Sequence, residues 1–324
     1  MEYQPETPYT AEPIPEARHA RRAASLCSFA AVAELVIVYA ILIPTSLLTR
    51  NISMGDQMRS NLSLIINTAA VDLIAMPLCW LLLLRRLPRN GAPALGERTR
   101  LSVPKLLFYF PCAFALMFAG SLVGKLVGLL FEKGLADVIG NTLGSVDPWV
   151  TLLCAVIVGP IAEELFFRKA MMDRLSDYHP IDAILLSALL FALVHGNLTQ
   201  FLYAFPLGVF FGIIYYRTRN IGYTILLHVA INTVGGLLPQ ILNAPVEGVP
   251  EFVPMITTLM TGLFAQFILA MSVVGVIFLI RNRREFLPIH SGHPRYKKPF
   301  FLNAGFIVAC VVFVALFVLN EIIA

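Results

Sequence analysis

Residues 255–280 read MITTLMTGLFAQFILAMSVVGVIFLI, and this stretch decides the fold class because it holds no charged side chain and no histidine. A helix of about 20 apolar residues crosses the roughly 30 Å hydrocarbon core of a bilayer. Eight more apolar stretches follow one another along the chain, at about residues 24–44, 62–84, 103–130, 148–168, 181–197, 199–216, 221–239 and 300–321. We therefore predict an all-α, polytopic transmembrane helical bundle of nine spans, with eight as the alternative count.

The composition of the chain points to the same class. Of the 324 residues, 58% are hydrophobic and 14% are charged, whereas soluble domains have about 25% charged residues. The net charge of +4 is small, and the basic residues lie between the apolar stretches. We therefore expect the bilayer as a partner and no nucleic acid. The five cysteines form no C-x-x-C pair and are expected to be free thiols.

The distribution of Lys and Arg predicts the orientation in the membrane. One alternating set of loops carries 20 of the 24 basic residues, and the opposite set carries three, Arg50, Arg59 and Lys133. Cytoplasmic loops are enriched in Lys and Arg. We expect an integral, multi-pass protein of a bacterial plasma membrane, with the amino terminus in the cytoplasm and the carboxyl terminus outside.

The chain is predicted to form one folded domain. Residues 1–22 are polar and contain four prolines, so we expect a disordered cytoplasmic tail. Residues 23–324 contain no polar linker and no internal repeat. They are expected to form a single membrane domain, whose catalytic core lies at about residues 148–239.

Charged side chains inside the predicted spans need an explanation, because each costs about 2.5–3.5 kcal/mol at the centre of a membrane helix. Glu34, Asp72 and Lys125 are expected to form structural pairs. Glu163, Glu164 and Arg168 differ, since they cluster in GPIAEELFFRKAMMDRL near a span end. Adjacent helical residues point about 100° apart, so the two acids should have separate tasks.

The spacing of Glu164 and Arg168 favours an ion pair along one helix face, which leaves Glu163 to face another part of the bundle. Water contact at the membrane boundary is the alternative explanation for both acids.

Two of the six histidines, His195 and His228, lie inside apolar segments. Phe191 precedes His195 by one helical turn, and Asn232 follows His228 by one turn on the same face. By the helical rise, His195 lies roughly 20 Å from the start of its segment. It reaches the level of Glu163 and His228 only if its helix is tilted or begins outside the membrane.

These side chains have the chemistry of a hydrolase. A carboxylate beside an imidazole can orient a water molecule and accept its proton, which suggests this task for Glu163 and His195. His228 and Asn232 can donate hydrogen bonds to the oxyanion that forms on the attacked carbonyl. Two histidines and a glutamate also resemble the ligand set of some zinc hydrolases. A divalent metal such as zinc, held by Glu163, His195 and His228, is therefore an alternative, although no H-E-x-x-H motif is present.

The ordered motifs resemble those of the CPBP intramembrane endopeptidases, a family that includes the type II CAAX prenyl protease and bacterial proteins linked to bacteriocin immunity and abortive infection. Glu163, Glu164 and Arg168 match the pattern E-E-x-x-x-R. Phe191 and His195 match F-x-x-x-H, and His228 and Asn232 match H-x-x-x-N. The resemblance covers roughly residues 148–239.

The resemblance implies an enzyme that cleaves peptide bonds near the cytoplasmic membrane face. It makes Glu163 and the two histidines the main catalytic groups, with Glu164 and Arg168 supporting. The family includes proteases described as metal-dependent and as glutamate-dependent, so both types stay open, and we favour glutamate-activated water with no required cofactor.

We therefore predict an intramembrane endopeptidase acting on a membrane-associated protein or peptide, for which a prenyl or other lipophilic part is one option and not a requirement. Its catalytic residues would be Glu163, His195, His228 and Asn232. Two other functions use the same features. A secondary or proton-coupled transporter would use the buried acids and histidines as a relay, and a membrane adaptor or immunity factor would keep the fold without catalysis.

Overall fold

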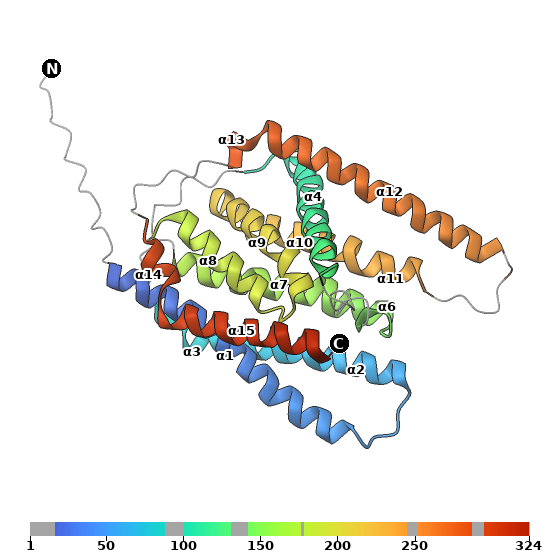
Figure 1. Ribbon diagram of the computed structural model, residues 1–324, viewed down its shortest axis with the longest axis horizontal. Coiled ribbons are helices and arrows are strands. Elements are labelled where there is room, and N and C mark those ends of the chain that lie inside the picture. The colour runs from blue at the N-terminus through green and yellow to red at the C-terminus, as the bar shows by residue number, and fades with distance from the viewer. Residues whose placement is uncertain are drawn as a thin grey trace, which may run out of the picture.

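The computed structural model describes residues 17–87, 100–130, 142–175, 178–244, 250, 252–286 and 295–323, and all regular elements in these ranges are helical. The all-α fold class is thus confirmed. In chain order (Figure 1), the elements are α1 (Ala17–Thr49), α2 (Asp56–Thr68), η1 (Ala69–Ala75), α3 (Met76–Leu82), η2 (Leu84–Arg86), α4 (Val103–Gly128), α6 (Pro148–Thr151), η3 (Leu152–Val158), α7 (Gly159–Glu163), η4 (Glu164–Met172), α8 (Pro180–Leu193), α9 (Leu198–Thr218), α10 (Ile221–Asn232), η5 (Thr233–Leu237), α11 (Leu238–Leu242), α12 (Phe252–Arg281), α13 (Arg283–Phe286), α14 (Lys297–Phe301) and α15 (Ala304–Ile323).

Several of these elements join end to end into longer helices. Seven helices in the described part of the chain are long and apolar enough to cross a membrane: Ala17–Thr49, Asp56–Arg86, Val103–Gly128, Pro148–Met172, Leu198–Thr218, Ile221–Leu242 and Phe252–Arg281. Two shorter apolar helices, Pro180–Leu193 and Ala304–Asn320, coincide with the other two predicted spans. The bundle agrees with the prediction, and the count of nine crossings stays a prediction.

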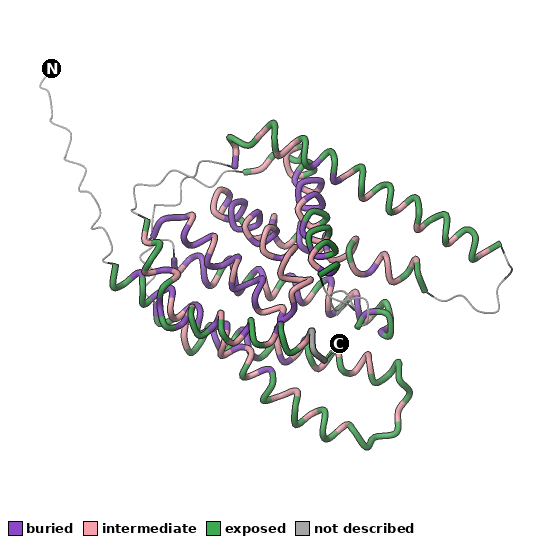
Figure 2. Tube along the Cα trace, in the orientation of Figure 1, coloured by how far each residue is buried: buried purple, intermediate pink, exposed green. Residues whose placement is uncertain are grey.

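The helices of the bundle differ in how far they are buried. Figure 2 shows α8 buried over most of its length, whereas α12 is largely exposed. In α9, half of the most apolar 18-residue segment is buried, whereas in α12 the buried share of the corresponding segment is 11%. Apolar side chains on the outer helices face outward, as expected where lipid replaces water as the solvent. Of the helices that carry candidate residues, Pro148–Met172 has 39% of its most apolar segment buried, whereas Ile221–Leu242 has 22%.

Glycines allow close contacts between the helix backbones. A methyl group at Gly275 of α12 would collide with the backbone carbonyl of Pro111 in α4. A methyl group at Gly120 of α4 would lie 2.5 Å from the Leu202 carbonyl oxygen in α9. Small residues are typical of membrane helix interfaces, because they let two backbones approach. Helix α4 is thereby held between α9 and α12.

Four segments, η1, η3, η4 and η5, have π-helical geometry. Three of them border candidate residues: η4 begins at Glu164, η3 ends directly before α7, and η5 follows Asn232. A π-helical turn bonds residue i to i+5, shifts the following side chains around the axis, and occurs frequently at functional sites. Uniform α-helical spacing therefore fails next to these residues.

The structure corrects two expectations about the first half of the chain. Residues 17–22 were expected in the disordered tail, but α1 begins at Ala17, because alanine and arginine are strong helix formers. Residues 1–16 lie outside the described range. Lys125 was expected in a structural pair, but it is exposed on α4, where a long side chain can extend towards the membrane surface.

Candidate active site

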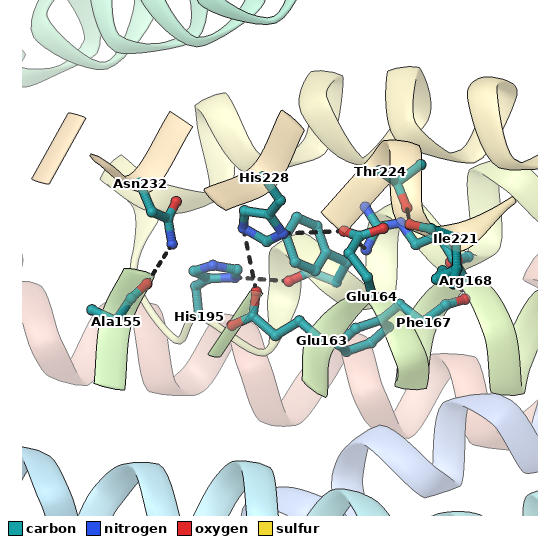
Figure 3. A network of polar contacts seen from close by, with 12 residues as sticks. Ala155, Glu163, Glu164, Phe167, Arg168, His195, Ile221, Thr224, His228 and Asn232 are labelled. Carbon is teal, nitrogen blue, oxygen red and sulfur yellow. Dashed lines mark hydrogen bonds and ion pairs between the residues drawn. The ribbon is translucent and has the colours of Figure 1, made fainter. Parts of the chain in front are cut away.

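The candidate residues come from three separate helical segments and meet in the bundle interior. Glu163 ends α7, and Glu164 begins η4. His228 and Asn232 lie one turn apart on α10, and His195 follows the end of α8. Figure 3 shows the side chains of His195, His228 and Glu163 directed towards one another. The convergence expected from the sequence is therefore present, including that of His195.

His228 lies between two carboxylates. Its Nδ1 atom is 3.1 Å from Glu164 Oε1, and its Nε2 atom is 3.5 Å from Glu163 Oε2. A carboxylate can only accept a hydrogen bond, so the first contact has Nδ1–H donating to Glu164. The adjacent acids contact opposite sides of a single imidazole ring, which agrees with the expectation that they have separate tasks.

Glu164 and Arg168 form the ion pair that their spacing predicts, with Arg168 Nη1 3.3 Å from Glu164 Oε1. Both side chains have 0% exposure. The contact is electrostatic, because no guanidinium N–H of Arg168 has an aligned hydrogen-bond acceptor within the described ranges. The guanidinium carbon also lies 4.2 Å from the centroid of the Phe191 ring, a distance suited to a cation–π contact. Arg168 therefore supports the buried charge of Glu164.

The Phe191 ring packs against both histidines. Its ring centroid lies 5.0 Å from that of His195 and 5.7 Å from that of His228, with edge-on packing in each case. His195 Nδ1 lies 2.8 Å from the Phe191 carbonyl oxygen. Because a carbonyl accepts only, Nδ1 carries the proton and Nε2 keeps a free lone pair. His195 is thus oriented as a hydrogen-bond acceptor at Nε2.

Asn232 is held by a contact that the sequence did not predict. Its Nδ2 group donates to the carbonyl oxygen of Ala155 in η3, at 2.8 Å. The amide has two N–H groups, so one remains for another acceptor. This bond ties α10 to the helix that carries Glu163. Nothing in the local sequence marked Ala155, because its contribution comes from the backbone.

The two acids differ in their access to solvent. The Glu163 side chain is 23% exposed, whereas that of Glu164 has 0% exposure. His228 is nearly buried, and His195 and Asn232 are partly exposed. Glu163 is therefore the acid that water can reach. The sequence assigned Glu163 to His195 for water activation, and in the structure the ring that contacts Glu163 is His228.

Two further acids lie close to Glu163. Asp72 in η1 faces α7, since a methyl group built on Gly159 would lie 3.9 Å from Asp72 Oδ2. Glu34 of α1 and Asp72 each have one buried oxygen with no hydrogen-bond partner in the described part of the chain. Neither acid is paired with a cation among the described residues, so the structural pairs expected for Glu34 and Asp72 are not seen there.

The alternative metal set is not found as a cluster in the structure. Across the described ranges, no three His, Cys, Asp or Glu side chains are arranged to hold a metal ion. The arrangement presents hydrogen-bonding groups to a polar reactant.

Comparison with known proteins agrees with these motifs. Residues 145–234 match the family described as "Type II CAAX prenyl endopeptidase Rce1-like". This range contains all seven motif residues and nearly coincides with the predicted core at residues 148–239. This match spans 90 of the 324 residues and supports the resemblance of the chain to the CPBP membrane proteases.

Two curated relatives extend this result. The Bacillus subtilis (strain 168) protein named "Putative membrane peptidase YdiL" is 28% identical over 168 residues, which cover 51% of this chain and 68% of the relative. The Lactococcus lactis subsp. lactis (strain IL1403) protein named "UPF0177 protein YbdJ" is 36% identical over 107 residues, covering 32% of this chain and 46% of the relative. No solved structure matches the chain. The similarity to this protease family and the apolar helices support an integral membrane protease.

Proposed function

We propose that this protein is an endopeptidase that hydrolyses peptide bonds with water activated by Glu163. The observation that carries the proposal is the position of His228 between Glu163 and Glu164, with Arg168 beside the buried acid. One acid is thereby held in a permanent ion pair, and the other is partly exposed. A pair of carboxylates in different environments is typical of sites that divide structural and proton-transfer tasks.

In the first step, a water molecule donates hydrogen bonds to the Glu163 carboxylate and to His195 Nε2. Its oxygen then attacks the carbonyl carbon of the peptide bond, and the proton that it loses passes to Glu163. The fixed tautomer of His195 serves this step, because the bond from Nδ1 to Phe191 leaves Nε2 free to accept.

The attack leaves negative charge on the former carbonyl oxygen. His228 Nε2–H and the second N–H of Asn232 donate to this oxyanion. Glu164 supports a doubly protonated His228 ring, because it accepts the bond from Nδ1–H. When the tetrahedral intermediate collapses, the C–N bond breaks and Glu163 returns its proton to the leaving nitrogen. The enzyme is then restored.

The substrate is proposed to be a membrane-associated protein or peptide with a lipophilic part, cleaved near the cytoplasmic face of the plasma membrane. In this orientation the amino terminus is cytoplasmic and the carboxyl terminus is outside. Support comes from the distribution of basic residues and from the name of the matching family.

The test is cleavage of quenched fluorescent peptides by the purified protein in liposomes, with farnesylated and unmodified peptides compared. Glu163→Gln keeps the shape of the side chain and removes the proton acceptor, so kcat should fall at least about 100-fold. His228→Ala and His195→Ala should also lower kcat. Glu285→Gln is the matched control, because Glu285 pairs with Lys105 on the outer part of the bundle.

An unchanged kcat in Glu163→Gln would contradict the assignment of Glu163 as the group that accepts the proton of water. Flux of a solute without cleavage would instead identify a transporter, and a cellular phenotype that survives all three substitutions would identify an adaptor.

Dependence on metal is tested separately. The proposed mechanism needs no metal, so overnight dialysis against a chelator should leave kcat within twofold of the untreated enzyme, and added zinc should not increase it. Loss of activity that zinc restores would contradict glutamate-activated water.

A further inference from the structure

The last helix of the chain contacts the turn that carries His195. Asn320 on α15 donates from Nδ2 to the backbone carbonyl oxygen of Gly196, at 2.7 Å. These residues are separated by 124 positions in the sequence, and α15 lies wholly outside the family-matched range of residues 145–234. Figure 1 shows α15 running alongside the bundle. Its role is therefore a feature of this chain that the shared motifs do not contain.

Several polar groups of the turn after α8 have hydrogen-bond partners within or next to the turn. The Gly196 N–H donates to the Leu193 carbonyl oxygen at 3.0 Å. The His195 carbonyl oxygen accepts from Asn197 Nδ2 at 3.0 Å, and Asn197 Oδ1 caps α9 by accepting from the Gln200 N–H. Gly196 has a φ of +69°, which favours glycine and is typical of a helix C-terminus. The Gly196 carbonyl is the group that needs a partner from elsewhere, and Asn320 supplies it.

Apolar contacts fix α15 in the position that this bond requires. A methyl group at Gly196 would lie 2.8 Å from Leu316 Cδ2, so Leu316 packs directly against the glycine. One turn from Asn320, Phe317 lies with its ring centroid 5.7 Å from that of Phe201 in α9. Helix α15 thus contacts both sides of the turn between α8 and α9.

We propose that Asn320 is a positioning residue for His195, and that α15 is part of the catalytic architecture through this one bond. The inference rests on the proposed function, in which His195 Nε2 orients the attacking water. His195 is tied to α8 through its ring and to α15 through the carbonyl of the next residue. Both ties together determine where Nε2 points.

The physical basis is the cost of an unpaired polar group in an apolar environment. Asn320 lies in a helix that is otherwise almost entirely apolar, and polar side chains in membrane helices form hydrogen bonds across helix interfaces. Without Asn320, the Gly196 carbonyl loses its hydrogen-bond donor, and the backbone of the turn gains conformational freedom. A displacement of about 1 Å of a group that aligns a reactant can lower the rate by about 100-fold.

The experiment compares Asn320→Ala with Asn243→Ala, a matched control whose amide donates to the Pro239 carbonyl of the preceding helical turn. Asn320→Ala should lower kcat by about 10-fold or more, with KM within twofold of wild type. Asn320→Gln, which keeps the donor on a longer side chain, should recover part of kcat. Asn243→Ala should behave as wild type.

A second measurement does not depend on activity. Nitrogen NMR of histidine-labelled protein in nanodiscs, with the His195 signals assigned by His195→Gln, reports the proton on Nδ1. Asn320→Ala should shift or broaden these signals, and Asn243→Ala should leave them unchanged. Unchanged His195 signals in a folded Asn320→Ala variant would overturn the inference, even if the wild-type protein cleaved no peptide. If the His195 signals change in Asn320→Ala but the wild-type protein cleaves no peptide, the proposed function is contradicted and the positioning of His195 by Asn320 is not.

Discussion

At the scale of single residues, the site depends on one imidazole with different neighbours on its two nitrogens. His228 donates to a buried, charge-paired Glu164 through Nδ1 and faces the partly exposed Glu163 through Nε2. The tautomer of His195 is fixed in a similar way by the Phe191 carbonyl. The three motif segments are therefore joined by hydrogen bonds, ion pairs and ring contacts.

The buried ion pair gives a prediction about stability. Arg168→Met removes the guanidinium and leaves the Glu164 carboxylate, which has 0% exposure, without its cation. The expected loss of folding free energy is about 3–5 kcal/mol. Thermal unfolding in a single detergent measures it, with the exposed Arg281→Met as the control.

Because the loss arises from the isolated charge, the double variant Arg168→Met/Glu164→Gln should be more stable than Arg168→Met alone. An Arg168→Met variant that unfolds at the wild-type temperature would show that the pair contributes nothing to stability.

At the scale of elements, the contact between α12 and α4 depends on the absence of a side chain at one position. Gly275 faces the Pro111 carbonyl in α4, whereas Gly262 on the same helix has no atom within 4 Å that an added methyl group would meet. Replacing glycine with alanine at each of the two positions therefore distinguishes the effect of helix packing on stability from the effect of helix propensity.

We expect Gly275→Ala to lower the free energy of unfolding by about 1–3 kcal/mol, because α12 must move away from α4. Gly262→Ala should leave it unchanged or raise it by up to about 1 kcal/mol, since alanine is the better helix former. Thermal unfolding of both variants in one detergent is the measurement. Equal shifts would mean that the close approach of α12 to α4 does not contribute to stability.

At the scale of the whole molecule, the orientation of the bundle can be tested with two exposed serines. They flank the helix Asp56–Arg86 in the sequence, so they lie on opposite sides of the membrane if that helix crosses it. Ser53 lies in the loop after α1, and Ser102 directly precedes α4. In intact cells, a thiol reagent that does not cross membranes should label Ser53→Cys. Ser102→Cys should react only after permeabilisation.

The parent protein gives a low background, because four of its five cysteines are buried. The reverse labelling pattern would invert the orientation, and equal labelling of both positions would show that Asp56–Arg86 does not cross the membrane.

Local sequence patterns were sufficient to predict the fold class and to single out the motif residues. Hydropathy is a local property, so each apolar stretch could be recognised independently, and the spacing of Glu164 and Arg168 was enough to predict their ion pair. Lys125 was misjudged for the same local reason, since spacing along one helix does not reveal whether that face meets protein or lipid.

Which groups contact each other across helices depends on the tertiary structure. The contacts of His228 with Glu163, of Asn232 with the Ala155 carbonyl and of Asn320 with Gly196 join residues from different helices. The π-helical segments beside Glu164 and Asn232 change which way the following side chains face. Helix rotation and register are set by packing over the whole bundle, and no local stretch of sequence contains that information.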